Sequence, residues 1–132
     1  MEFTRYFLKG LKGTLRFNNG VNFAYKGPWV QVEPNTAIDE FYVGDFMAAE
    51  YTICIDGGNT AKEIIKCLVV AGPSDASITV YGRTSLTGDM VNLNATVNSS
   101  KLTLLASPAT AGTKKLIFSA TYYHTINDLV RE

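Results

Sequence analysis

Hydrophobic and polar side chains alternate along several short stretches of this chain. Between 89 and 97 the residues at 91, 93, 95 and 97 are apolar, whereas those at 92, 94 and 96 are Asn, Asn and Thr. A period of two is typical of a strand that turns one face to a core and the other to water. The stretch 116–123 alternates in the same way, so both stretches are predicted to be strands.

Turn residues between the alternating runs predict antiparallel hairpins. The run 101–105 follows Asn98-Ser99-Ser100 so closely that it should pair with 89–97. The run 50–55 ends at Asp56-Gly57-Gly58-Asn59, where the glycines allow a tight reversal into 63–71. The segment 63–71 is apolar nearly throughout and fits a central strand or a buried helix. Its Ile and Val content and the Gly72-Pro73 stop favour a strand.

Short strands without amphipathic helices between them predict an all-β fold, an antiparallel β-sandwich or a barrel-like relative of it. The run 77–81 adds a sixth strand, and 14–17 and 21–25 around Asn18-Asn19-Gly20 predict a further hairpin. At 132 residues the chain has the length of one ordinary domain. We expect residues 35–132 to form the sandwich module and residues 1–34 to form a separate N-terminal hairpin and interface segment.

The N-terminal segment 1–34 differs from the rest of the chain in charge and in aromatic content. It holds five basic and two acidic residues, although the whole chain has a formal charge of zero, and it contains seven of the 15 aromatic residues. Aromatic residues together with arginine are enriched in subunit contacts. This composition also fits a stacking platform for single-stranded nucleic acid, but we expect a protein interface. The candidate interface residues are Tyr6, Phe7, Arg16, Phe23, Tyr25 and Trp29.

No motif in the sequence predicts a catalytic, metal or cofactor site. Apart from carboxylates, the only side chains in the sequence that commonly bind metal ions are Cys54, Cys67 and His124. We expect the two cysteines to be reduced, buried thiols and His124 to be a packed strand residue. Asp56-Gly57-Gly58-Asn59 lacks the spaced carboxylates of a calcium loop. The carboxylates of Asp39, Glu40, Asp45 and Glu50 are expected to be solvated surface charges rather than a glycosidase pair.

The N-terminus also lacks the features of a targeting signal. Arg5, Lys9 and Lys12 interrupt any apolar core that a secretory peptide would need. Nothing in the chain approaches the roughly 20 consecutive apolar residues of a membrane-spanning helix. We therefore expect a soluble, unprocessed protein with no membrane or nucleic-acid partner.

Several of these runs together resemble a known β-sandwich module. Ala49-Glu50-Tyr51 opens a strand, Glu63 leads an aliphatic strand and Tyr81-Gly82 closes the next one, and 91–97 and 101–108 are similar to the final strands. In these features residues 38–126 resemble a module in virion proteins of contractile-tailed phages, particularly those of marine cyanobacteria. Residues 1–34 lie outside the resemblance.

The resemblance implies a non-enzymatic virion structural protein: a head decoration, neck, tail or fibre-associated component that acts through protein–protein assembly. Its partners would be other copies of itself and other virion proteins, with assembly in the host cytoplasm. A trimer is the preferred state because fibre-type components resemble threefold assemblies, and a dimer is the alternative. The alternative function is a carbohydrate-binding module that recognises host surface glycans through Trp29, Tyr42 or Tyr81. A small hydrolase or lyase would need a polar cluster that the sequence does not contain.

Overall fold

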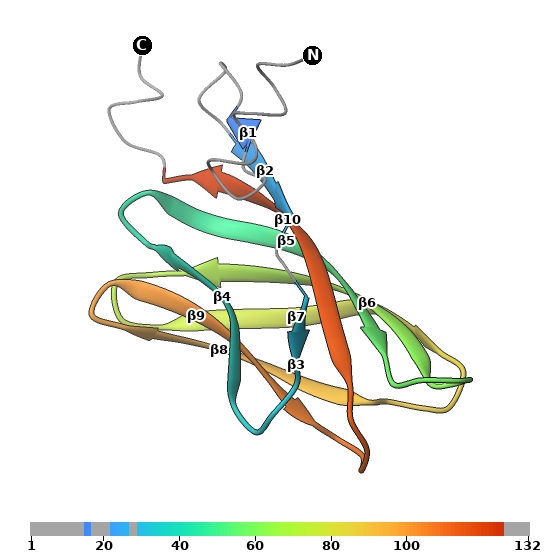
Figure 1. The fold of residues 1–132 in the computed structure, drawn as a ribbon. Helices are drawn as coiled ribbons and strands as arrows, with labels where there is room; N and C mark the ends of the chain where they lie inside the picture. Colours follow the sequence, from blue (N-terminus) through green and yellow to red (C-terminus); the bar gives the residue numbers. More distant parts are fainter. Residues whose placement is uncertain (1–14, 17–21, 27–28, 126–132) are drawn as a thin grey trace.

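Two antiparallel sheets make up the fold, as seen in a computed structural model (Figure 1). The structure describes the backbone of residues 15–16, 22–26 and 29–125, and the side chains of 29–125. This part of the chain contains strands and no helix, which confirms the all-β prediction. The strands are β1 (Leu15–Arg16), β2 (Asn22–Lys26), β3 (Val30–Gln31), β4 (Thr36–Tyr42), β5 (Phe46–Asp56), β6 (Lys62–Ala71), β7 (Ala76–Ser85), β8 (Val91–Asn98), β9 (Lys101–Pro108) and β10 (Lys115–His124).

The two sheets differ in size. The large sheet has the strand order β1-β2-β10-β5-β6-β7, and β3 also pairs with β10. The small sheet has the order β4-β9-β8. Since β2 and β3 both pair with β10, the described strands that precede residue 35 belong to the large sheet.

Strand β6 settles the ambiguity of the segment 63–71. Its residues alternate strictly between exposed and buried from Lys62 to Ala71, and it pairs with β5 on one side and β7 on the other. A helix of this sequence would turn charged and apolar side chains to the same side. A central strand instead directs Ile65, Cys67 and Val69 into the core and leaves the intervening side chains on the opposite face.

The core lies between the two sheets. The largest fully buried side chains come from both layers, with Tyr51, Ile53 and Ile65 from the large sheet and Leu102 and Leu104 from the small one. These residues stand at alternate positions along their strands, so the period-two pattern of the sequence is the pattern of burial. Packing of the two apolar faces is what holds the layers together.

Two of the predicted turns are present, and each contains residues with positive φ. Ser99 and Ser100 both have positive φ (54° and 63°) and form a two-residue turn between the paired residues Asn98 and Lys101. At the other hairpin Gly58 has φ 92° and the Gly57 amide donates to the Ala61 carbonyl at 2.7 Å. Each reversal therefore sets the register of a long antiparallel pair.

Strand β4 was not predicted as a strand. Its pairing with β9 skips Ile38, because the register shifts between Ala37 and Asp39. A bulge of this kind places one extra residue in the strand and breaks the period-two pattern on which the sequence argument depends. Residue Asp39 comes directly after the shift, and its side chain is consequently directed toward the large sheet, where it contacts Tyr51 and Tyr122.

Candidate functional site

The large sheet has an outer face, which is the face turned away from the small sheet. Cross-strand pairing arranges its side chains in rows that run over β10, β5 and β6. One row is Lys115, Asp56 and Lys62, and the next is Ile117, Cys54 and Ile64, followed by Thr84 of β7. A charged row therefore lies beside an apolar row on neighbouring strands.

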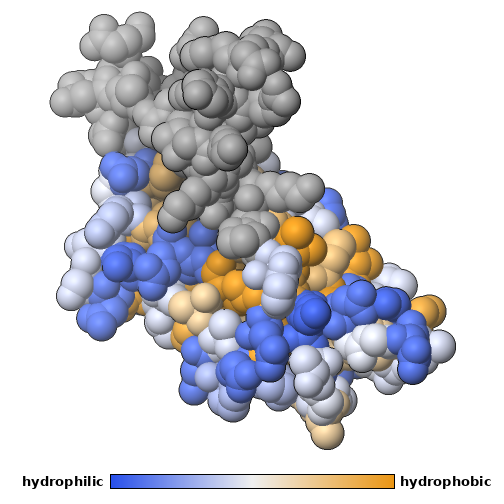
Figure 2. Space-filling model, in the orientation of Figure 1, coloured by the Kyte–Doolittle hydropathy of each residue, from blue (hydrophilic) through white to orange (hydrophobic). Residues whose placement is uncertain are grey.

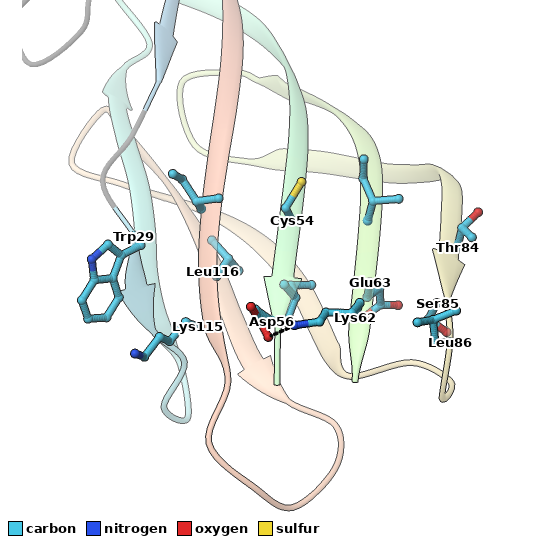
Figure 3. A pocket seen from close by; sticks show the side chains of 13 residues that line it. Trp29, Cys54, Asp56, Lys62, Glu63, Thr84, Ser85, Leu86, Lys115 and Leu116 are labelled. Atoms are coloured by element: carbon cyan, nitrogen blue, oxygen red, sulfur yellow. Dashed lines mark hydrogen bonds and ion pairs between the residues drawn. The ribbon is translucent and has the colours of Figure 1, made fainter. Parts of the chain in front are cut away.

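The apolar row forms the floor of a groove of about 720 Å³, and the charged row forms its border. Trp29 lies at one side of the groove and Leu86 at the other, with Cys54 and Asp56 of β5 between them (Figure 3). Both flanking side chains are exposed, Trp29 by 59% and Leu86 by 70%. The groove combines an apolar floor with an exposed aromatic ring and a charged border.

The charges at the border hold one another in place. The Lys62 ammonium donates to Asp56 Oδ1 at 2.7 Å, and the Gly58 amide donates to the same oxygen at 2.8 Å. The hydrogen bond from Lys62 is the main reason why the pKa of the Asp56 carboxyl lies below its usual value. Lys115 Nζ lies 4.9 Å from the centre of the Trp29 ring, a cation–π contact.

The exposed face of β6 carries an apolar patch that begins in the groove, defined here as Ile64, Leu68 and Val70. These three side chains are 43%, 48% and 53% exposed. Apolar side chains also gather in the middle of the face drawn in Figure 2, among hydrophilic ones. A central strand whose outer side chains are aliphatic is unusual for a sheet face that meets only water.

Next to this patch, Tyr81 and Glu50 form a hydrogen bond on the outer face. The Tyr81 hydroxyl donates to Glu50 Oε2, a contact that joins β7 to β5 across β6. This hydrogen bond is the first reason why the pKa of Tyr81 is raised. Lys66 is exposed on the same face, opposite Thr52 in the register, and Glu50 is opposite Leu68.

The expectation that the carboxylates are solvated surface charges was wrong for Asp39. Its Oδ2 accepts hydrogen bonds from the hydroxyls of Tyr51 and Tyr122, both at 2.6 Å, so it links the small sheet to two strands of the large one. Burial raises the pKa of the Asp39 carboxyl, and the two hydrogen bonds oppose that rise. The cluster is enclosed between the sheets, which makes it a structural tie. The neighbouring Glu40 is exposed, as expected.

The buried carboxylate of Glu63 was likewise not expected from the sequence, which indicated only that this residue leads a strand. Its side chain is fully buried, and Oε1 accepts from the Met90 amide at 3.0 Å. Arg83 Nε lies 3.4 Å from Glu63 Oε2, and Arg83 Nη1 lies 2.9 Å from Asp89 Oδ2. Arg83 also donates to the Val91 carbonyl at 3.1 Å. This network ties β6 and β7 to the start of β8.

The two cysteines lie on opposite faces of the large sheet. Cys67 is buried, and burial raises the pKa of its thiol to about 11, whereas Cys54 is exposed in the groove. The expectation of two buried thiols was therefore wrong for Cys54, because Cys67 is opposite Tyr51, and Cys54 is an odd number of positions along the same strand and so points to the other face. His124 lies 4.9 Å from Phe46, ring centre to ring centre, as a packed strand residue. The part of the chain that the structure describes contains no group of three metal-ligating side chains.

The residues predicted for subunit contact and for glycan binding do not come together in one site of the described structure. Tyr6 and Phe7 lie outside the described residues, and Arg16, Phe23 and Tyr25 are described in backbone only, within β1 and β2. Only Trp29 of that set has a described side chain. Of the glycan candidates, Trp29 and Tyr81 lie on the large sheet, but Tyr42 lies on the small one. Among the residues with described positions, no helix is long and apolar enough to cross a membrane.

Comparison with known proteins gives fold-level likenesses alone. No family model matches the sequence, and no curated protein matches it. The solved structures that it resembles include the tailspike of Acinetobacter baumannii phage AM24, with TM-score 0.48 and 12% identity over 86% of this chain and 28% of that one. The tailspike of Acinetobacter phage vB_ApiP_P1 gives TM-score 0.43 and 15% identity over 83% of this chain and 23% of the other.

A third likeness is to a tailspike from Acinetobacter baumannii bacteriophage Fri1, described as a capsular polysaccharide depolymerase. It has TM-score 0.43 and 9% identity over 89% of this chain and 23% of that one. The chain thus spans less than a third of the length of each solved chain. All three are tailspikes of Acinetobacter phages, and none bears on the cyanobacterial, contractile-tailed setting that the sequence resemblance implies.

Proposed function

We propose that this chain is a non-enzymatic structural module of a phage particle, at the tail or fibre, and that it acts through protein–protein contact. The observation that carries the proposal is the apolar patch Ile64, Leu68 and Val70 on the outer face of a central strand. Aliphatic side chains at this density are stabilised by a partner surface that removes them from water. The phage setting is supported by the sequence resemblance over residues 38–126.

The polar groups of the described residues support a structural role in the same way. The partly buried carboxylate of Asp39 joins the two sheets through hydrogen bonds, and the buried carboxylate of Glu63 is held by the Met90 amide and Arg83. Asp56 in the groove is paired with Lys62. These carboxylates serve packing and surface charge balance, and the chain's contribution to the particle is its shape and its contact face.

The test is association with the other virion proteins. The chain is co-expressed with the proteins encoded beside it, and complexes are isolated through a tag on the chain. Leu68→Asp should abolish a complex that forms with the unchanged protein, because a charge would enter the contact. Thr96→Asp, on the exposed face of β8, is the matched control and should leave the complex intact. Absence of the chain from purified particles, measured by mass spectrometry, would refute the proposal.

Glycan binding is the second candidate, and one observation favours it. The Trp29 ring is exposed at the border of a groove that also contains the hydroxyls of Thr84 and Ser85 and the Asp56–Lys62 pair. Exposed aromatic rings beside hydrogen-bonding groups suit the apolar face and the hydroxyls of a sugar. A glycan array should then give binding that Trp29→Ala removes and Tyr42→Ala keeps. Binding that survives Trp29→Ala would exclude this groove.

A further inference from the structure

The outer face of the large sheet presents charges of both signs around an apolar centre. On β5 and β6 the residues Glu50, Thr52, Lys66 and Leu68 form a parallelogram, since Glu50 is opposite Leu68 and Thr52 is opposite Lys66. Glu50 and Lys66 occupy one diagonal, and Leu68 and Thr52 occupy the other. No ion pair between Glu50 and Lys66 is found within this described face, where Glu50 instead accepts from Tyr81.

This arrangement is complementary to itself. A twofold axis lying in the interface along the Thr52–Leu68 diagonal brings Glu50 of each copy to within about 3 Å of the position of Lys66 of the other. Each carboxylate then faces the ammonium of the other copy, and Leu68 faces Leu68. The chain as a whole has a formal charge of zero, so two copies do not repel one another overall.

The geometry of sheet packing permits this contact. With strands about 4.8 Å apart and same-face residues about 6.7 Å apart, the diagonal makes the strands of the two copies cross at roughly 70°. That angle is close to the orthogonal class of sheet-on-sheet packing. Two twisted sheets that cross in this way touch best where their strands cross, and Leu68 lies beside that point because it is at one end of the diagonal.

The outer face is also large enough for a weak dimer contact. Along β6 it runs from Lys62 to Val70, about 27 Å, and with its neighbouring strands it is about 19 Å wide. Two faces of this width that cross at roughly 70° overlap over about 400 Å² per copy, so a pair covers roughly 800 Å², the size of a weak dimer contact. The relief of the side chains, including Tyr81, adds to this area.

We propose that the occupant of this face is a second copy of the chain, held in a twofold contact with Leu68 at the axis and reciprocal Glu50–Lys66 pairs. The inference deepens the proposed function and rests on it, because it names the partner of the same patch. It favours the dimer, which was the alternative to a trimer in the sequence-based expectation. The contact is isologous and therefore closes on itself.

Cysteine cross-linking tests the axis directly. In a Cys54→Ser background, Leu68→Cys should be joined to its copy by a short bis-maleimide and yield a dimer on a denaturing gel, because facing residues of two packed sheets lie about 10 Å apart, too far for a direct disulfide. Asn94→Cys in the same background, on the outer face of the small sheet, is the matched control and should remain monomeric. Circular dichroism and thermal melting check that both variants fold.

Charge exchange tests the reciprocal pairs. Glu50→Lys or Lys66→Glu alone places two like-charge contacts in each dimer. Either substitution should raise the dimer dissociation constant by roughly a hundredfold, as measured by analytical ultracentrifugation. The double exchange should restore it to within about tenfold of the unchanged protein.

A folded protein that is monomeric, or trimeric without a Leu68 cross-link, overturns the inference. So does a double exchange that fails to restore association. A monomer that still binds other virion proteins through the patch, and loses them with Leu68→Asp, would leave the proposed function standing while the second-copy inference fails. A monomer in which Leu68→Cys is protected from maleimide would show that the chain covers its own patch, and it too overturns the inference.

Discussion

At the scale of single residues, Asp39 gives the molecule its most distinctive polar contact. One carboxylate oxygen accepts hydrogen bonds from two tyrosine hydroxyls, and both tyrosines are buried in the opposite sheet. The hydroxyls depend on this acceptor, because buried donors without a partner are costly. Removal of the carboxylate from water, however, disfavours its charged form, which is why its pKa is raised.

The stability of the protein should therefore fall as pH rises through the titration of Asp39. Since the folded-state pKa is raised above 3.8, the folded protein binds more protons than the unfolded chain in the window that begins near pH 4. Asp56 acts in the opposite direction, but below its ordinary pKa, so the two windows are separate. Asp39→Asn should remove the Asp39 slope, measured by urea unfolding between pH 4.5 and 7.5.

Asp39→Ala is the informative companion variant. It removes the acceptor from both hydroxyls and should cost about 2–4 kcal/mol at pH 7, whereas the Asn variant keeps an acceptor and should stay within about 1 kcal/mol of the original. An Asn variant with the original pH slope would show that Asp39 is not the titrating group.

At the scale of elements, the β8–β9 hairpin is held by a turn whose residues do not suit its backbone. Ser99 and Ser100 both have positive φ, as a type I′ turn requires, and this conformation favours Asn and Gly. The Ser100 carbonyl also accepts from the Val43 amide at 3.0 Å, so the turn is fixed in position by the chain that follows β4.

Replacing the turn residues should stabilise the hairpin. The double substitution Ser99→Asn and Ser100→Gly should raise the free energy of unfolding by about 0.5–1.5 kcal/mol, because it relieves two left-handed positions. Chemical denaturation measures the change. Ser77→Gly, at an exposed position within β7, serves as the control and should destabilise by roughly 0.5–1 kcal/mol. Equal losses at both sites would contradict the turn assignment.

At the scale of the whole molecule, β10 is the strand through which the early part of the chain joins the sandwich. It pairs with β5 along one edge, and along the other it pairs with β2 at 119–123 and with β3 at 115–116. The role of residues 1–34 in subunit contact stays a prediction. Their described strands also have a role within one copy, because they satisfy backbone groups of β10.

A chain that starts at Asn35 should therefore be less stable as well as altered in assembly. Removal of β2 and β3 leaves seven residues of β10 with an open edge, and we expect a drop of several degrees in the melting temperature together with aggregation on heating. Differential scanning calorimetry with light scattering measures both. Trp29→Ala, which changes a side chain and no backbone pairing, is the control. An unchanged melting temperature after the deletion would show that these strands contribute nothing to the fold.

Strands whose side chains alternate without interruption could be predicted from the sequence. It predicted β8, β9 and β10, the hairpins at 56–59 and 98–100, and the all-β class, because burial on one face of a strand imposes a period of two wherever the strand is regular. It did not predict β4, since the bulge at Ile38 breaks that period. It also read Asp39 as a surface charge, because nothing local indicates that two tyrosines more than ten residues away would reach it.

The candidate surface was decided by the tertiary structure alone. Trp29, Asp56 and Leu86 lie far apart in the sequence, and only the pairing of β10, β5, β6 and β7 brings them around one groove. Likewise the sequence of β6 shows that apolar side chains lie on both faces of the strand, but it does not show which face the small sheet covers. The three strands of the small sheet cover one face of the large sheet, and the side chains of Ile64, Leu68 and Val70 are left outside because each sheet has two faces and a single chain of this length buries one of them.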